Sequence, residues 1–197
     1  MAVDPIGRQR VVVTVHGIRT FGQWKERLES LLRTQSTSIE VVHYHYGYFS
    51  IFAFVIPFLR WIQVRRFRNA LIQLSEKNPA SELSIVAHSF GTHLVGWALR
   101  GLRGKGPGVK NVILAGSVLR SNFPWNPLIA NGQVERVVND CAIRDKVLLL
   151  SEFGAPLTGM AGRVGFNGMT GRALKRVRLC CTRDMLVRLQ FHLHVES

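Results

Sequence analysis

The chain has 197 residues, of which 47% are hydrophobic and 9% aromatic, enough apolar material for one domain with a substantial core. Its formal net charge is +14 at pH 7, concentrated in residues 60–68 and 163–188. Such charge attracts anionic surfaces, and an anionic membrane surface is one partner to expect. No zinc-finger or RNP-type sequence accompanies the charge, so we expect no specific nucleic-acid partner.

The cysteines and the apolar runs exclude several other classes of protein. Three cysteines, Cys141, Cys180 and Cys181, are an odd number without metal-ligand spacing, so neither a disulfide framework nor a zinc site is expected. Residues 1–10 contain no apolar signal segment, and no uninterrupted apolar run reaches the roughly 18 residues needed to span a bilayer. We therefore expect a cytoplasmic protein.

Strand and helix patterns alternate from the start of the chain. The β-branched run at residues 11–15 predicts a buried parallel strand. A helix follows, beginning with capping-box spacing at Thr20 and Gln23 and ending near Arg33. Residues 39–46 indicate a second strand. An apolar stretch at residues 48–59, interrupted by Pro57, precedes a helical pattern. The apolar positions of that pattern, which stops at Asn78-Pro79, are Val64, Phe67, Leu71 and Leu74.

The same alternation continues through the second half. Strands are predicted at residues 83–87, 109–118 and 134–142, with a helix at residues 92–103. The tail leaves a helix at 172–178 and a strand at 177–182 as alternatives, and residues 189–195 alternate as in a strand. Because strands alternate with helices and no second domain stands out, we expect one α/β domain over residues 1–197, with a mostly parallel sheet covered on both faces.

The turn at Ser89 is the most informative motif. Ala87-His88-Ser89-Phe90-Gly91 lies between a predicted strand and a predicted helix. A sharp strand-to-helix turn with small residues two places either side of a serine holds its hydroxyl exposed at the top of a sheet. Alanine replaces the first glycine of the usual Gly-x-Ser-x-Gly pattern. We predict that Ser89 is a nucleophile.

A nucleophilic serine needs amide donors for the oxyanion of its tetrahedral intermediate. His16-Gly17 ends the first strand, and glycine permits close approach of the backbone to a substrate. The amides of Ile18 and Phe90 are the predicted pair. We expect His16, His88 and His93 to be structural.

The serine also needs a base and an acid that orients the base. Asp145 follows the strand at residues 134–142 and is the predicted acid, with Asp140 as the alternative. Only His192 and His194 follow in sequence. We predict His192 as the base, with His194 as the alternative; a chain in which neither acts is the third reading. Acyl transfer by a serine needs no metal or organic cofactor, and we expect none.

The order of these motifs resembles the α/β-hydrolase superfamily. More narrowly, residues 15–20 (Val-His-Gly-Ile-Arg-Thr), followed by Trp24, are similar to bacterial serine esterase and lipase-like domains. The resemblance covers roughly residues 11–150. It implies a three-layer α/β-hydrolase sandwich, minimal or shortened at its C-terminal end, with Ser89 as nucleophile, Asp145 as acid and a late histidine as base. The chain departs from the pattern at Ala87, in its paired histidines and in having no helix after its last predicted strand.

Two segments are candidates for substrate contacts. Residues 48–59 predict an apolar wall for an acyl chain, with Phe52 and Phe54 in it and nearby arginines (Arg60, Arg65 and Arg66) for anionic head groups; a buried core segment is the alternative. Residues 122–127 predict an aromatic loop in which Trp125 forms a second wall.

Three functions follow from these patterns. The first is hydrolysis of a carboxylic ester, either a small-molecule or a lipid or acyl ester, through an acyl-enzyme. The second is a catalytically impaired hydrolase-like scaffold that acts as a binding or regulatory module. The third is a basic protein that binds nucleic acid or a membrane surface and whose serine turn is incidental.

Overall fold

A parallel β-sheet forms the centre of the molecule. The computed structural model describes residues 9–17, 29–30, 32–34, 39–45, 56–142, 166–167 and 174–179. Its six strands are ordered β2-β1-β3-β4-β5-β6, and every neighbouring pair is parallel. The strands are β1 (Arg10–Val15), β2 (Ile39–Tyr44), β3 (Glu82–His88), β4 (Val109–Ala115), β5 (Val134–Ala142) and β6 (Leu174–Leu179). The expected mostly parallel α/β sheet is confirmed.

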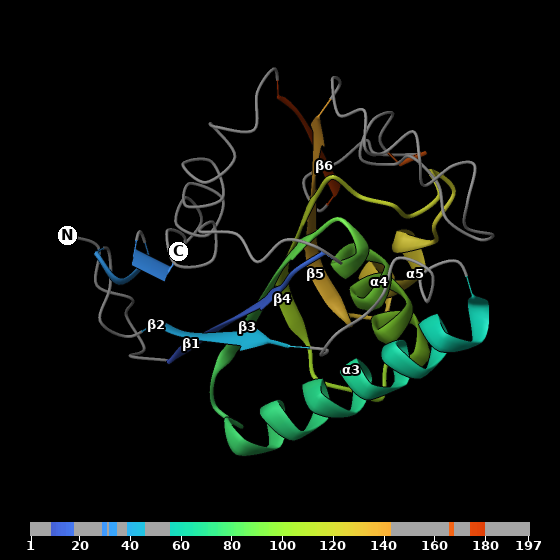
Figure 1. Ribbon diagram of the computed structural model, residues 1–197. Coiled ribbons are helices and arrows are strands. Elements are labelled where there is room, and N and C mark those ends of the chain that lie inside the picture. The colour runs from blue at the N-terminus through green and yellow to red at the C-terminus, as the bar shows by residue number, and fades with distance from the viewer. Residues whose placement is uncertain are drawn as a thin grey trace.

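Three of the described helices cover one face of the sheet. They are α3 (Pro57–Lys77), α4 (Phe90–Leu102) and α5 (Trp125–Ala130), all on the same side in Figure 1. Their apolar side chains join those of alternate strand residues, such as Val13, Ile85 and Leu114, in the larger core cluster. This face of the sheet is therefore the principal core.

A second, smaller cluster lies on the opposite face. There Leu32 packs with Val12, Val86 and Ile113. The helical residues around Leu32 lie across the sheet from α3 and α4 (Figure 1). Helical residues on both faces agree with the layered arrangement predicted from the sequence.

A polar network ties this second layer to the sheet. The Nε2–H of His43 donates to Glu29 Oε2 at 3.0 Å, which leaves His43 Nδ1 to accept from the Thr14 hydroxyl at 2.6 Å. Arg33 Nε also donates to Glu29, at 2.8 Å. The hydrogen bonds from His43 and then from Arg33 lower the pKa of Glu29. The network therefore holds Glu29 as a carboxylate against β2.

Helix α3 begins and ends where its sequence dictates. Pro57 occupies the first turn, where its missing N–H is not needed, so this proline starts the helix rather than interrupting it. Val64, Phe67 and Leu71 are buried at helical spacing, as predicted. At the other end the Asn78 side chain donates to Leu74 O at 3.1 Å, and Pro79 follows.

The tail and the aromatic segment differ from two expectations. The helical alternative at residues 172–178 is wrong, because β6 pairs with β5 from Leu174 to Leu179. The segment at residues 122–127 is not a simple loop, because Trp125 begins α5. The predicted strand at residues 189–195 and the predicted helix start at Thr20 lie outside the described residues.

Candidate functional site

Ser89 occupies a backbone conformation that few residues adopt. It joins β3 to α4 with φ 52° and ψ −123°, in the region that favours glycine. Holding a serine there costs about 1–3 kcal/mol, so the surrounding structure must impose it. The Ser89 side chain makes no capping hydrogen bond to α4. The hydroxyl is therefore not used to begin the helix.

Hydrogen bonds fix the turn. The Ser89 N–H donates to Ala115 O at 2.9 Å, which ties the turn to β4. The Thr92 hydroxyl donates to Ser89 O at 2.7 Å and accepts from the Val118 N–H at 3.1 Å. Thr92 is fully buried, so this relay is shielded from water. These contacts over-determine the position of Ser89.

The small residues around the serine have different roles. A Cβ atom at Gly91 would lie 2.4 Å from Val15 O and 2.9 Å from His16 O, so only glycine fits where α4 meets the end of β1. Ala87 is fully buried in β3, in register with Val15 and Leu114, and its φ is not positive. A methyl group is accommodated there, which explains why alanine can replace the first glycine of the pattern.

The end of β1 lies directly beside this turn. His16 is 5% exposed, and its Nδ1–H donates to Gly17 O at 2.7 Å. This contact fits the predicted structural role of His16. Phe90, one of the two predicted oxyanion donors, is the first residue of α4. The other, Ile18, lies outside the described residues.

The candidate acids belong to the same edge of the sheet or to the segment after it. His88, Ala115 and Asp140 form one register row across β3, β4 and β5, so Asp140 lies near the level of Ser89. Asp140 is 8% exposed. Since all strands are parallel, β5 ends at the edge where Ser89 begins α4. Asp145, His192 and His194 lie outside the described residues.

The predicted substrate walls have different outcomes. Phe52 and Phe54 lie outside the described residues. Trp125 is 1% exposed and packs against Phe123, at 4.9 Å between ring centroids, and Phe166, at 5.8 Å. This burial corrects the prediction that Trp125 lines a substrate wall, because α5 turns its ring into the core.

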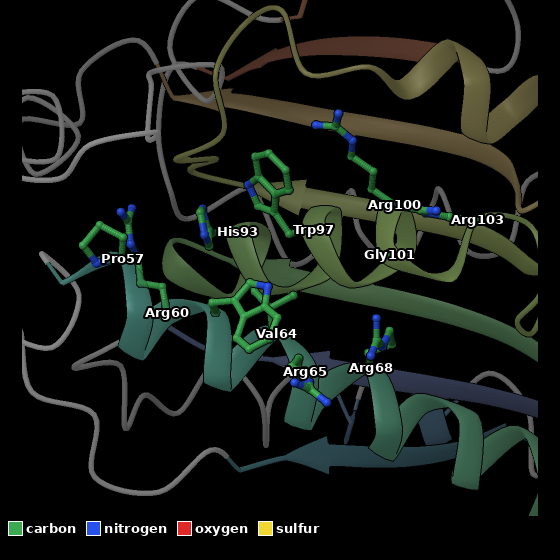
Figure 2. Close-up of a pocket in the computed structure, with 11 residues that line it drawn as sticks. Pro57, Arg60, Val64, Arg65, Arg68, His93, Trp97, Arg100, Gly101 and Arg103 are labelled. Atoms are coloured by element: carbon green, nitrogen blue, oxygen red, sulfur yellow. The ribbon is translucent and has the colours of Figure 1, made fainter.

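A pocket between α3 and α4 was not anticipated. It has a volume of about 390 Å³, and residues of both helices line it, among them His93 and Trp97 of α4 (Figure 2). Burial, and then the charge of Arg60, lowers the pKa of His93 to about 3, so the imidazole is neutral. The sequence carried one usable signal: helical spacing puts Arg65 and Arg68 on a different side of α3 from Arg66. The lining residues are Pro57, Arg60, Trp61, Val64, Arg65, Arg68, His93, Trp97, Arg100, Gly101 and Arg103.

Neither a metal-binding cluster nor a membrane-spanning helix occurs among the described residues. No group of three histidine, cysteine or acidic side chains in the described ranges is arranged to hold a metal ion. None of the helices described above combines the length and apolar character that crossing a membrane requires.

Solved structures resemble this chain in fold at low sequence identity. No protein-family model matches the sequence, and no curated protein matches it. The crystal structure of the lin2722 gene product of Listeria innocua superposes with a TM-score of 0.64 at 8% identity, covering 96% of this chain and 95% of that one. An acetyl xylan esterase superposes with a TM-score of 0.51 at 9% identity, covering 93% of this chain and 94% of that one. With its parallel sheet and its serine turn between β3 and α4, the chain has the fold of a small α/β-hydrolase.

Proposed function

We propose that this protein is a serine hydrolase that cleaves carboxylic esters through an acyl-enzyme on Ser89. The observation that carries the proposal is the Ser89 backbone, with φ 52° and ψ −123° at a strand-to-helix junction. A fold keeps such strain where it serves a purpose, and here the purpose is to present the hydroxyl at the carboxyl edge of the sheet. The esterase-like fold is consistent with this chemistry.

The proposed reaction has two halves. Ser89 Oγ attacks the ester carbonyl carbon while His192 takes the hydroxyl proton, and the N–H groups of Phe90 and Ile18 stabilise the oxyanion. Collapse of the intermediate breaks the ester bond, and the histidine returns the proton to the departing alcohol. Water then repeats the attack on the acyl-serine, which releases the acid and restores Ser89. Asp145 orients the base in this scheme.

The remaining assignments are part of the same proposal. His194 is the alternative base and Asp140 the alternative acid. Phe52 and Phe54 contribute an apolar wall, which favours a hydrophobic acyl group on a small-molecule or lipid ester or an acyl thioester. The scheme needs no cofactor, because every proton and electron pair is exchanged among serine, histidine, ester and water.

A fluorophosphonate probe, which labels activated serines covalently, tests the nucleophile. We expect labelling of the wild-type protein and no labelling of Ser89→Ala. The matched control is Ser81→Ala, because Ser81 lies at the opposite end of β3 and should label like the wild type. Labelling that persists in Ser89→Ala would overturn the assignment of Ser89.

A catalytically impaired scaffold is the second candidate function. What favours it is the i,i+2 spacing of His192 and His194, which on the predicted strand puts both rings on one face rather than in a loop. A folded wild-type protein that neither reacts with the probe nor hydrolyses p-nitrophenyl esters would support this candidate. Separate His192→Ala and His194→Ala variants identify the base if hydrolysis is found.

A further inference from the structure

The pocket between α3 and α4 is strongly basic. Among the lining residues that the structure describes, none is acidic, and five are arginines: Arg60, Arg65, Arg68, Arg100 and Arg103. Within the described part of the chain, four of them make no ion pair with a carboxylate: Arg65, Arg68, Arg100 and Arg103. Five positive charges around about 390 Å³ create a field that favours an anion.

Aromatic rings hold two of these arginines in place. The Arg65 guanidinium lies over the Trp61 ring, 4.7 Å from its centroid, and the Arg100 guanidinium lies over Trp97 at 4.9 Å. Such stacking restricts the side chains before any ligand arrives, which reduces the entropy lost on binding. Arg68 reaches across to α4, because its Nη1 lies 3.2 Å from where a Cβ of Gly101 would be. The cations are therefore pre-organised on both walls.

His93 adds a polar group at one end of the pocket. It is 6% exposed and stacks on Phe90 with ring centroids 5.7 Å apart. Its Nδ1 is buried, and no group in the described ranges forms a hydrogen bond with it. An unpaired buried polar atom costs about 1–3 kcal/mol, which a ligand group in the pocket would recover. Figure 2 shows His93 beside Arg60 at the Pro57 end of the pocket.

We propose that the α3–α4 pocket binds the phosphate group of a phosphate ester, with arginines from both helices and the His93 imidazole as its hydrogen-bonding partners. A phosphate has several oxygens and up to two negative charges, so it can satisfy guanidinium groups arriving from two directions, whereas a single carboxylate offers only two oxygens. The volume lies in the range typical of small-ligand pockets. Val64 and the tryptophans leave apolar surface for the organic part of the ester.

Two sources can present this group, a soluble phosphate ester or a phospholipid. The first turns of α3 expose three large apolar side chains, Ile56 at 47%, Phe58 at 65% and Trp61 at 53%. Apolar and aromatic side chains next to arginines are typical of surfaces that contact lipid head groups. Trp61 belongs both to this group and to the pocket, so the exposed apolar surface adjoins the proposed phosphate site. Phe58 belongs to the apolar group alone, so its substitution can separate the two sources.

Calorimetric titration of the full chain with glycerol 3-phosphate tests the site, with glycerol as the neutral control. We expect saturable binding that weakens at least fivefold in Arg65→Gln and Arg68→Gln. Arg66→Gln is the matched control: it removes the same charge from the same helix at an exposed position that does not line the pocket, and affinity should stay within twofold. No binding, or an equal loss in Arg66→Gln, would overturn the proposal. Ser89→Ala should bind like the wild type, so the result does not depend on the proposed hydrolase activity.

Co-sedimentation with vesicles distinguishes the two sources. If the phosphate comes from a lipid, the protein should co-sediment with vesicles of phosphatidylcholine and phosphatidic acid. The fraction of protein that sediments with the vesicles should then fall at least fivefold in Arg68→Gln and in Phe58→Ser. Binding of glycerol 3-phosphate without vesicle binding supports the soluble source. Vesicle binding that is unchanged in Arg68→Gln but lost in Phe58→Ser would overturn the pocket as the lipid site. Circular dichroism of each variant confirms that it is folded.

Discussion

At its first turn, α4 packs against backbone: a methyl group at Gly91 would lie 2.4 Å from the carbonyl oxygen of Val15. Nearly three turns further along, a methyl group at Gly101 would meet the end of the Arg68 side chain at 3.2 Å. One helix therefore has a rigid, tightly packed end at Ser89 and an outer side that faces an arginine-lined pocket. The first environment suits chemistry that depends on position, and the second suits a ligand held by charge.

Removal of the Ser89 hydroxyl should have the largest effect and should separate the two regions. Under the proposed mechanism, kcat/KM for p-nitrophenyl butyrate falls by at least about 10³-fold in Ser89→Ala, because the attacking group is lost. The unfolding temperature should change little, since the side chain does not cap α4. If Ser89→Ala no longer hydrolyses the ester but still binds glycerol 3-phosphate with unchanged affinity, the two regions work independently. A loss of both would mean that they are coupled.

Two of the three glycines of α4, Gly91 and Gly101, should respond in opposite directions. Gly91→Ala should lower the free energy of unfolding by about 2–3 kcal/mol, because the carbonyl groups of Val15 and His16 belong to β1 and cannot move freely. Gly101→Ala should raise it by about 0.5–1 kcal/mol, since alanine favours the helix and Arg68 can shift. Urea denaturation measures both. Equal destabilisation would show that α4 is as constrained at its outer side as at its first turn.

The tightly packed region was accessible from the sequence because its signals are local. Parallel strands buried on both faces are continuous apolar runs, so the run at residues 11–15 was predicted to within one residue of the observed β1. The strand at residues 134–142, which also contains polar residues, was predicted with its observed bounds. The serine turn was recognised from five consecutive residues. By contrast, β6 combines three cations with two leucines and a valine without strict alternation, a pattern that also suits a short amphipathic helix. Only its pairing with β5 decides between the two.

The pocket could not be predicted, because it depends on which helices are neighbours. Arg65 and Arg100 belong to different helices, and nothing in the sequence pairs them. The basic residues of α3 form one cluster in the sequence, although helical geometry separates Arg66 from the lining residues. The prediction for Trp125 fails for a related reason: an aromatic residue after a strand is typical of a ligand wall, and only tertiary packing places this one in the core.

The buried His93 should make stability depend on pH. Its pKa falls from 6.5 to about 3 on folding, mainly through burial and then through Arg60. The unfolded chain therefore binds a proton that the folded protein excludes, and stability is lost as the pH falls below 6.5 toward 3. Between pH 7 and pH 5 the free energy of unfolding of the wild type should fall by about 2 kcal/mol more than that of His93→Gln. Urea denaturation of both proteins at the two pH values measures this difference. A constant difference would mean that His93 binds its proton in the folded state.

The two ends of α4 can also be compared directly, because both have a positive φ: Ser89 at 52° before the helix and Arg103 at 50° after it. Glycine relieves this strain, although its greater freedom in the unfolded chain offsets part of the gain. Ser89→Gly and Arg103→Gly should therefore each raise the free energy of unfolding by about 1 kcal/mol, measured by thermal denaturation. Only Ser89→Gly should abolish ester hydrolysis, because strain at Arg103 ends a helix whereas strain at Ser89 presents the nucleophile. If Ser89→Gly were less stable than the wild type, the turn would not be strained, and the main support for Ser89 as the nucleophile would be lost.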